Sequence, residues 1–272
     1  MKIPIFQVDA FASGPFTGNP AAVCVLDGPR ESEWMQQVAM EMNLSETSFL
    51  VPRDAHHREF DLRWFTPAIE VPLCGHATLA SSHILWETAR LRTDEAARFH
   101  TLSGWLTAKK SGDQIEMDFP AILHEKVALP DRLAEALGLE PNDIICNRGL
   151  GKEDSNFLLE LDSEETVRNL KPNFELLRRT VNAGIIVTSR GSSSKYDFIS
   201  RYFACYAGID EDPVTGSAHC MLAPYWSAKL GKVEMLAFQA SARGGEVGVR
   251  FNGERVVLIG QALTVLQGSL LC

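Results

Sequence analysis

Two long stretches without a charged side chain constrain the fold of this sequence more than any other feature. From Gly75 to Trp86, and again from Gly216 to Ser227, the chain contains no Asp, Glu, Lys or Arg. Each stretch is long enough for a helix, and a helix on a protein surface would carry charges on its outer face. We therefore expect two helices that are buried on all sides, each at the centre of its own lobe.

The two helices belong to a degenerate internal repeat. An aromatic segment at Phe60–Phe65 precedes the first helix, and a similar segment at Tyr196–Phe203 precedes the second. Gly75 and Gly216, which lead the helices, are 141 residues apart in a chain of 272, which is about half its length. An aromatic strand before a helix also arises by chance, but the paired charge-free helices favour a duplication. The sequence thus predicts two similar lobes.

Short apolar runs typical of strands occupy much of the remaining chain. They lie at Ala21–Leu26, Phe49–Val51, Phe157–Leu159 and Gly184–Val187. The region from Phe238 to Leu271 is broken by Asn-Gly and other glycine turns, which predicts a meander of short strands. The fold class is therefore α+β and rich in strands.

Composition limits the partners and the cellular compartment. The formal net charge is -9, and Lys and Arg are nowhere clustered as binding to a nucleic-acid backbone requires. No stretch approaches the roughly 20 apolar residues of a membrane span, and the six cysteines include no Cys-x-x-Cys pair. We expect a cytoplasmic protein with reduced thiols that binds neither nucleic acid nor membranes.

Cofactor motifs are also missing from the sequence. No glycine-rich phosphate loop of the GxGxxG or GxxxxGK type is present, so nucleotides have no visible binding site. No other His, Cys or carboxylate stands at zinc-site spacing around His76. We therefore expect activity that needs no metal, nucleotide or pyridoxal phosphate.

Glu46 is the first candidate for chemistry. It lies within Asn43-Leu44-Ser45-Glu46-Thr47, at a junction between a helix and an apolar strand and beside hydroxyl residues. An isolated Glu at such a junction is more often simply solvated. A partly buried carboxylate of raised pKa, however, suits acid–base catalysis.

Cys74 and His76 flank Gly75 at the start of the first buried helix. A helix N-terminus would depress the pKa of the Cys74 thiol and make it reactive, although a free Cys is equally often a small buried apolar group. His76 is placed to donate a hydrogen bond to a substrate. The small residues in the first turn of each helix leave backbone N–H groups open to an anion such as a carboxylate.

Asp212 precedes the second buried helix. Pro213 holds it in an extended conformation, and Thr215 and Ser217 follow directly. These side chains could face the same anion, or they could be ordinary capping residues, and both interpretations stay open. Asn19 lies in a turn, Phe16-Thr17-Gly18-Asn19-Pro20, that could line a cleft.

Taken together, these clusters resemble the PhzF-like family, which is named for a phenazine-biosynthesis isomerase and is related in fold to diaminopimelate epimerase. The matching segments extend over nearly the whole chain: Asp9–Phe11, Phe16–Val23, Asn43–Thr47, Phe65–Pro67, Pro72–Leu79 and Glu211–Ala218. Arg63–Pro67 and Ser241–Glu246 are especially similar to the branch that contains the mammalian phenazine-biosynthesis-like domain protein.

The resemblance implies two pseudo-symmetric lobes, each a curved mixed sheet wrapped around a central helix, with the site between them and a homodimeric assembly. It places an N-terminal lobe at 1–117, completed by the C-terminal strand 263–272, and a C-terminal lobe at 118–262. It further implies an isomerase that moves a proton on a small carboxylate-bearing substrate without a cofactor.

Carried over residue by residue, the resemblance makes Glu46 the catalytic acid/base and His76 and Asp212 its catalytic partners. The substrate-binding positions that it implies are Asn19, Ser45, Gly75, Thr215, Gly216 and Ser217. Related epimerases use two thiols, and Cys74 matches the first of them, whereas the position of the second falls near Thr215, which disfavours a two-thiol racemase. An epimerase that pairs Glu46 with Asp212 or Cys74, and a scaffold protein that has kept the fold, remain alternatives.

Overall fold

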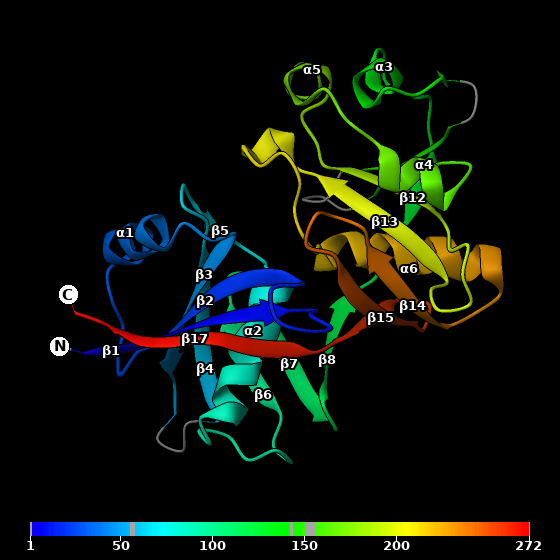
Figure 1. Cartoon of the computed structure of the whole chain (residues 1–272). Coiled ribbons are helices and arrows are strands. Elements are labelled where there is room, and N and C mark those ends of the chain that lie inside the picture. The colour runs from blue at the N-terminus through cyan, green and yellow to red at the C-terminus, as the bar shows by residue number, and fades with distance from the viewer. Residues whose placement is uncertain (1, 55–57, 142–143, 151–155, 272) are drawn as a thin grey trace. The chain divides into compact units, whose positions relative to one another are not determined.

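The computed structural model of the chain describes residues 2–54, 58–141, 144–150 and 156–271 (Figure 1). The chain divides into two compact units. Unit 1 comprises Met1–Phe119 and Val257–Cys272, and unit 2 comprises Pro120–Val256. In the described part of the chain, no helix is long and apolar enough to cross a membrane.

Each unit combines a sheet with a few helices. The elements of unit 1 are β1 (Ile3–Ala10), β2 (Asn19–Val25), α1 (Ser32–Met42), β3 (Glu46–Pro52), β4 (Glu59–Phe65), β5 (Glu70–Val71), α2 (Gly75–Glu87), β6 (Ala97–Thr101), β7 (Gly104–Ser111), β8 (Gln114–Pro120) and β17 (Ala262–Leu270). Those of unit 2 are β9 (His124–Lys126), α3 (Leu133–Leu137), β10 (Ile145–Gly149), β11 (Phe157–Glu160), α4 (Glu164–Asn169), α5 (Phe174–Thr180), β12 (Ile185–Arg190), β13 (Phe198–Phe203), the 3-10 turn η2 (Cys205–Ala207), α6 (Gly216–Leu230), β14 (Glu234–Gln239) and β15 (Gly245–Phe251), while β16 (Arg255–Gly260) crosses the boundary.

The strands of the two units pair in the same order and with the same directions. In unit 1 the order is β17-β1-β2-β3-β4-β6-β7, antiparallel except for the parallel pairs β2–β3 and β4–β6. In unit 2 it is β9-β10-β11-β12-β13-β14-β15, antiparallel except for β11–β12 and β13–β14. Each parallel pair requires a crossover, and helices supply all four crossovers. The predicted α+β fold of two similar halves is confirmed.

The helix α2 is buried within unit 1, as the absence of charges predicts. It packs against β1, β2, β3 and β17, and its side chains from His76 to Trp86 are buried except for a partly exposed His83. The hydroxyls of Ser81 and Ser82 donate to backbone carbonyls one turn earlier, at 2.7 and 2.8 Å. Its polar groups therefore find partners inside the helix, whereas a charged side chain would be buried without one.

The helix α6 takes the corresponding place in unit 2. Trp226 stacks on Phe198 of β13 with ring centroids 5.7 Å apart, and its indole N–H donates to Thr188 of β12 at 3.0 Å. Pro224 lies inside the helix, and Gly231 ends it in the left-handed conformation with φ 66°. The predicted starts of both helices, at Gly75 and Gly216, and their burial are confirmed, while α2 extends to Glu87 and α6 to Leu230.

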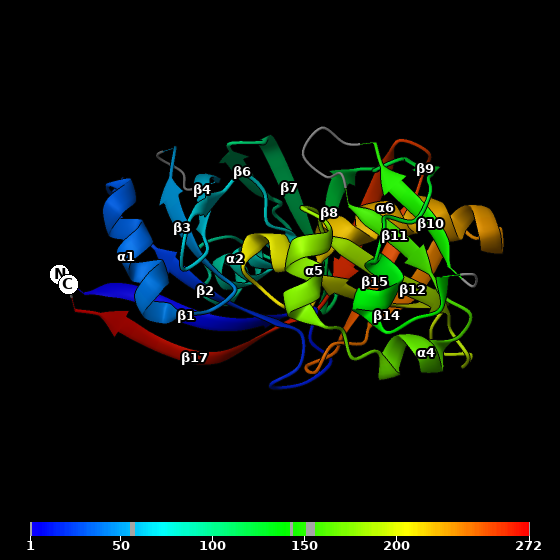
Figure 2. The same cartoon turned by 90° about the horizontal axis from the view of Figure 1, so that it is seen from above.

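The C-terminal strands depart from the predicted meander. β14 and β15 form the expected antiparallel pair, but β17 pairs with β1, so that Ile3 faces Leu270 and Ala10 faces Ala262. The two strands run side by side in both views (Figures 1 and 2). The outer edge of β1 carries backbone groups that need partners, and β17 supplies them.

Candidate active site

The segment that leads into each buried helix is itself repeated. Glu70-Val71-Pro72-Leu73-Cys74-Gly75-His76-Ala77-Thr78 corresponds to Glu211-Asp212-Pro213-Val214-Thr215-Gly216-Ser217-Ala218-His219 at a constant separation of 141 residues. In unit 1, Arg63 of β4 binds the first residue of the segment, Glu70, through two hydrogen bonds of 2.6 and 2.7 Å. In unit 2, Arg201 of β13 binds Glu211 in the same way, at 2.7 and 2.9 Å.

The helix starts also share a backbone contact. The carbonyl of the N-cap residue Cys74 accepts a hydrogen bond from Thr78 Oγ1 at 2.5 Å. The carbonyl of Thr215 likewise accepts one from His219 Nδ1 at 2.8 Å. The Thr215 side chain makes no capping hydrogen bond to the first turn of α6, so ordinary capping does not explain this residue.

Four residues from distant parts of unit 1 meet at the start of α2. Helix α1 ends at Asn43 in the left-handed conformation, which turns the chain so that Glu46 begins β3. Glu46 Oε2 lies 3.0 Å from His76 Nε2, with side-chain exposures of 15% and 5%. The other ring nitrogen, Nδ1, lies 3.6 Å from Cys74 Sγ and 3.2 Å from Asn19 Nδ2. The imidazole thus bridges a carboxylate and a thiol.

Glu46 and His76 lie close together but do not form a well-aligned hydrogen bond. Their two atoms lie within ion-pair distance but lack the alignment of a hydrogen bond. Both atoms are buried, and neither has another hydrogen-bond partner within the described residues. Because buried polar atoms are normally paired, these two are available to a polar group of a ligand.

Burial and mutual proximity set the protonation of this cluster. Burial raises the pKa of the Cys74 thiol, and Glu46 raises it further, so the prediction of a depressed pKa is wrong. The helix N-terminus does not outweigh the loss of water around the sulfur. Burial alone would lower the pKa of His76, but Cys74 and Glu46 raise it well above its ordinary value. A proton-bearing imidazole beside Glu46 follows.

The cluster contains three donor types that metals bind. One atom from each of Glu46, Cys74 and His76 lies within 4.8 Å of the others. Spacing along the sequence could not reveal this group, because β3 brings Glu46 to the helix start from a distant part of the chain.

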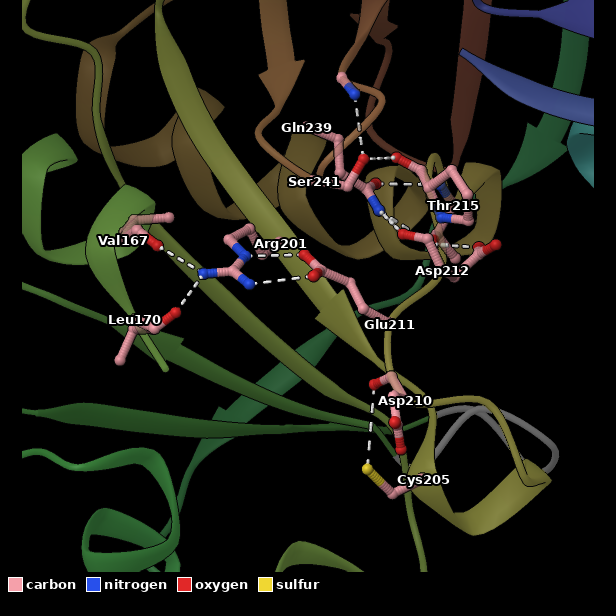
Figure 3. A network of polar contacts seen from close by, with 12 residues as sticks. Val167, Leu170, Arg201, Cys205, Asp210, Glu211, Asp212, Thr215, Gln239 and Ser241 are labelled. Atoms are coloured by element: carbon pink, nitrogen blue, oxygen red, sulfur yellow. Dashed lines mark hydrogen bonds and ion pairs between the residues drawn. The ribbon is translucent and has the colours of Figure 1, made fainter. Parts of the chain in front are cut away.

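In unit 2, Asp212 is part of a hydrogen-bonded turn in front of α6 (Figure 3). Thr215 Oγ1 donates to Asp212 Oδ2 at 2.5 Å. The fully buried amide of Gln239, at the end of β14, accepts from Thr215 N at 2.9 Å and donates to the Asp212 carbonyl at 2.8 Å. Ser241 adds a hydrogen bond to the Pro213 carbonyl at 2.8 Å.

Arg201 fixes the same turn from the other side. Besides Glu211, its guanidinium binds the carbonyls of Val167 and Leu170 at the end of α4, at 3.3 and 2.8 Å (Figure 3). The segment before Asp212 is thereby tied to β13 and α4. Sequence analysis missed both Arg201 and Gln239. A signal for Arg201 was available, because Arg201-Tyr202-Phe203 repeats the pattern of Arg63-Trp64-Phe65.

The predicted site residues fall into one group in each unit. Unit 1 holds Asn19, Glu46 and His76 in contact, with Ser45 directly before β3 and Gly75 as the first residue of α2. Unit 2 holds Asp212 and Thr215 in contact, with Gly216 and Ser217 opening α6.

The two groups differ in chemistry. The repeat aligns Cys74 with Thr215 and His76 with Ser217. The strand pairing gives the position that corresponds to Glu46. Thr47 pairs with Phe65 in unit 1, and Ile185 pairs with Phe203 in unit 2, so Thr47 corresponds to Ile185. The residues directly before these two, Glu46 and Gly184, therefore correspond as well. Titratable groups at these three positions are therefore confined to unit 1.

The α+β fold of this chain is shared with PhzF, epimerase and racemase structures. The chain belongs to the family described as phenazine biosynthesis-like protein, whose model matches residues 8–268. An uncharacterized isomerase of Halalkalibacterium halodurans is 51% identical over 272 residues, which is 100% of this chain and 99% of the relative. The human phenazine biosynthesis-like domain-containing protein is 43% identical over 290 residues, with 99% of each chain covered.

Solved structures agree with this assignment. A crystal structure of a PhzF family phenazine biosynthesis protein from Enterococcus faecalis superposes with a TM-score of 0.91 at 38% identity, and all of both chains is covered. The epimerase and racemase structures are 12% identical to this chain and share its fold alone.

Proposed function

We propose that this protein is an isomerase that moves a proton on a small carboxylate-bearing substrate, with Glu46 as its acid/base. The name isomerase given to the 51% identical relative supports this type of enzyme. The observation that carries the proposal is the position of Glu46 Oε2, buried 3.0 Å from His76 Nε2 with neither atom bonded elsewhere within the described residues.

In the proposed reaction, Glu46 accepts a proton from a substrate carbon and returns it to another position. The proton-bearing His76 lies beside this carboxylate, because Cys74 and Glu46 raise the pKa of the imidazole well above its ordinary value. His76 can also donate to a substrate oxygen on which negative charge develops. The N-terminus of α2 adds backbone N–H groups and the positive end of the helix dipole, which suit a substrate carboxylate.

A two-base epimerase is the second candidate, and one contact favours it. Cys74 Sγ lies 3.6 Å from His76 Nδ1, so the thiol could exchange a proton through the imidazole. Against it, the repeat aligns Cys74 with Thr215, whose hydroxyl cannot serve as the second thiolate. Inversion of a chiral substrate together with deuterium uptake would select the epimerase.

A deuterium-exchange experiment tests the proposal across many candidate substrates at once. The purified protein is incubated in D2O with a small-molecule extract, and mass spectrometry follows metabolites that gain deuterium or convert to an isomer of equal mass. We expect one such metabolite, or a small related group, with a carboxylate in common. The Glu46→Gln protein is the control, because it keeps the shape of the side chain and cannot accept a proton from carbon. An extract left unchanged by the wild-type protein, or changed equally by the variant, would contradict the proposal.

A further inference from the structure

We infer that Glu46, Cys74 and His76 form a binding site for a thiophilic transition-metal dication, Zn2+ above all, and that the bound ion inhibits the protein by occupying Glu46. Inhibition of the protein by the ion rests on the proposed function of Glu46, whereas binding of the ion does not. The ion is an inhibitor in this proposal and takes no part in the reaction.

The donor set selects the class of ion. A thiolate, an imidazole and a carboxylate are the three side-chain types that zinc accepts, whereas Mg2+ and Ca2+ require oxygen ligands throughout. Thiolate ligation favours soft or borderline ions. Three protein ligands with an open fourth position are typical of zinc sites that are accessible to a small molecule, since closed structural sites use four.

The distance between sulfur and imidazole fits such an ion directly. Zinc binds sulfur at about 2.3 Å and histidine nitrogen at about 2.0–2.1 Å, so a tetrahedral angle places those two atoms about 3.6 Å apart. Cys74 Sγ and His76 Nδ1 are 3.6 Å apart. An ion can therefore bind between them with little movement of either side chain, and it replaces the contact of Nδ1 with Asn19 Nδ2.

Glu46 supplies the third ligand by a small rearrangement. It faces Nε2 across the imidazole ring, and one donor atom of each residue lies within 4.8 Å of the other two. Ligand atoms of a tetrahedral zinc ion are about 3.3–3.6 Å apart. To close a separation of 4.8 Å, the carboxylate has to move by about 1.2–1.5 Å toward the ion. Its Oε2 has no directed hydrogen bond to break within the described residues. Binding of the ion releases the proton of the Cys74 thiol and one proton of the His76 imidazole to solvent. The resulting thiolate and the Glu46 carboxylate together neutralise the charge of the dication.

Unit 2 provides an internal comparison for this site. The positions that correspond to Glu46, Cys74 and His76 are Gly184, Thr215 and Ser217. A glycine and two hydroxyls do not bind Zn2+ at neutral pH, so no second ion is expected at the corresponding place in unit 2.

Cobalt absorption spectroscopy tests the site without a substrate, since Co2+ replaces Zn2+ and reports its own ligands. Titration of the wild-type chain with Co2+ should give one equivalent of tetrahedral d–d absorption with a thiolate-to-cobalt charge-transfer band, and Zn2+ should displace it. Cys74→Ser should abolish the charge-transfer band. Glu46→Gln should retain the band and weaken Zn2+ affinity by at least about tenfold. Cys272→Ser, which removes a thiol outside the described residues, is the control and should leave the spectrum unchanged.

The outcomes separate this inference from the proposed function. A wild-type spectrum without the charge-transfer band, or the same band in folded Cys74→Ser protein, overturns the metal site. If the band behaves as expected and one equivalent of Zn2+ stops the deuterium uptake described above, both proposals are supported. If the spectra are as expected but the protein exchanges no metabolite hydrogen, the proposed isomerase function is overturned and the metal site is not. Exchange that persists with Zn2+ bound overturns the inhibition.

Discussion

Thr215 donates its hydroxyl hydrogen to Asp212 Oδ2 over 2.5 Å. The direction of this bond is set by Gln239, whose Nε2 donates to Thr215 Oγ1 at 3.2 Å and leaves the hydroxyl hydrogen for the carboxylate. Asp212 is therefore held as a hydrogen-bond acceptor, the role of an ionised carboxylate.

Removal of this hydroxyl should destabilise the protein measurably. Thr215→Val keeps the shape of the side chain but leaves Asp212 Oδ2 without this donor. We expect the free energy of unfolding to fall by about 1.5–3 kcal/mol at neutral pH, because the bond is to a charged group. Urea unfolding measures the change. Thr215→Ser retains the hydroxyl and should be close to wild type, and equal losses in the two variants would contradict this account.

Glu46→Gln should separate binding from chemistry. A positioned acid/base contributes about 100- to 10,000-fold, so the exchange rate of the substrate should fall by that factor with a modest change in affinity. Cys74→Ser is the matched comparison, since a thiol-based epimerase responds strongly to that change and little to Glu46→Gln. If Glu46 is only structural, the variant instead loses thermal stability and activity in parallel.

Gly18→Ala should disturb the approach to Asn19. Gly18 has φ +71°, and a Cβ there would lie 2.2 Å from the Ala10 carbonyl oxygen, which is backbone and cannot rotate away. We expect a loss of more than about 1 kcal/mol in the free energy of unfolding. Gly14→Ala, where a Cβ meets nothing within 4 Å, is the control for chemical denaturation. Equal stability of the two variants would show that the turn adapts.

His219 should make the protein sensitive to acid. Burial lowers its pKa from 6.5 to about 4, so the unfolded chain takes up a proton that the folded protein excludes. The stability should therefore fall as the pH drops from 6.5 and level off below about 4, by up to about 3 kcal/mol. His219→Asn can still donate to the Thr215 carbonyl and should flatten this part of the stability curve. A curve of unchanged slope would rule out His219 as the cause.

Sequence alone predicted the parts of the fold that depend on local pattern. The charge-free stretches led to α2 and α6, and the aromatic segments led to β4 and β13. Local pattern did not predict the pairing of β17 with β1, because a strand pattern shows which face is buried and says nothing of the partner strand. The resemblance to the family, in contrast, placed the C-terminal strand 263–272 in the N-terminal lobe.

The site was predictable to a similar degree. The residues at each helix start were found, but the meeting of Glu46 with His76 depends on the crossover through α1, which no spacing along the chain reveals. The raised pKa of Cys74 depends on burial of the thiol, which the local sequence pattern also does not reveal. The predicted homodimer and cytoplasmic location stay predictions.

The pairing of the first strand with the last has a consequence for synthesis on the ribosome. Unit 2 is one continuous segment, whereas unit 1 lacks β17 until the segment that follows unit 2 has been made. The N-terminal half, which carries Glu46 and His76, must therefore wait with an open sheet edge while the second half is translated. Such an open sheet edge can pair with strands of other nascent chains. Unit 1 therefore cannot complete its sheet before unit 2 has been synthesised, although domains generally fold one after another from the N-terminus.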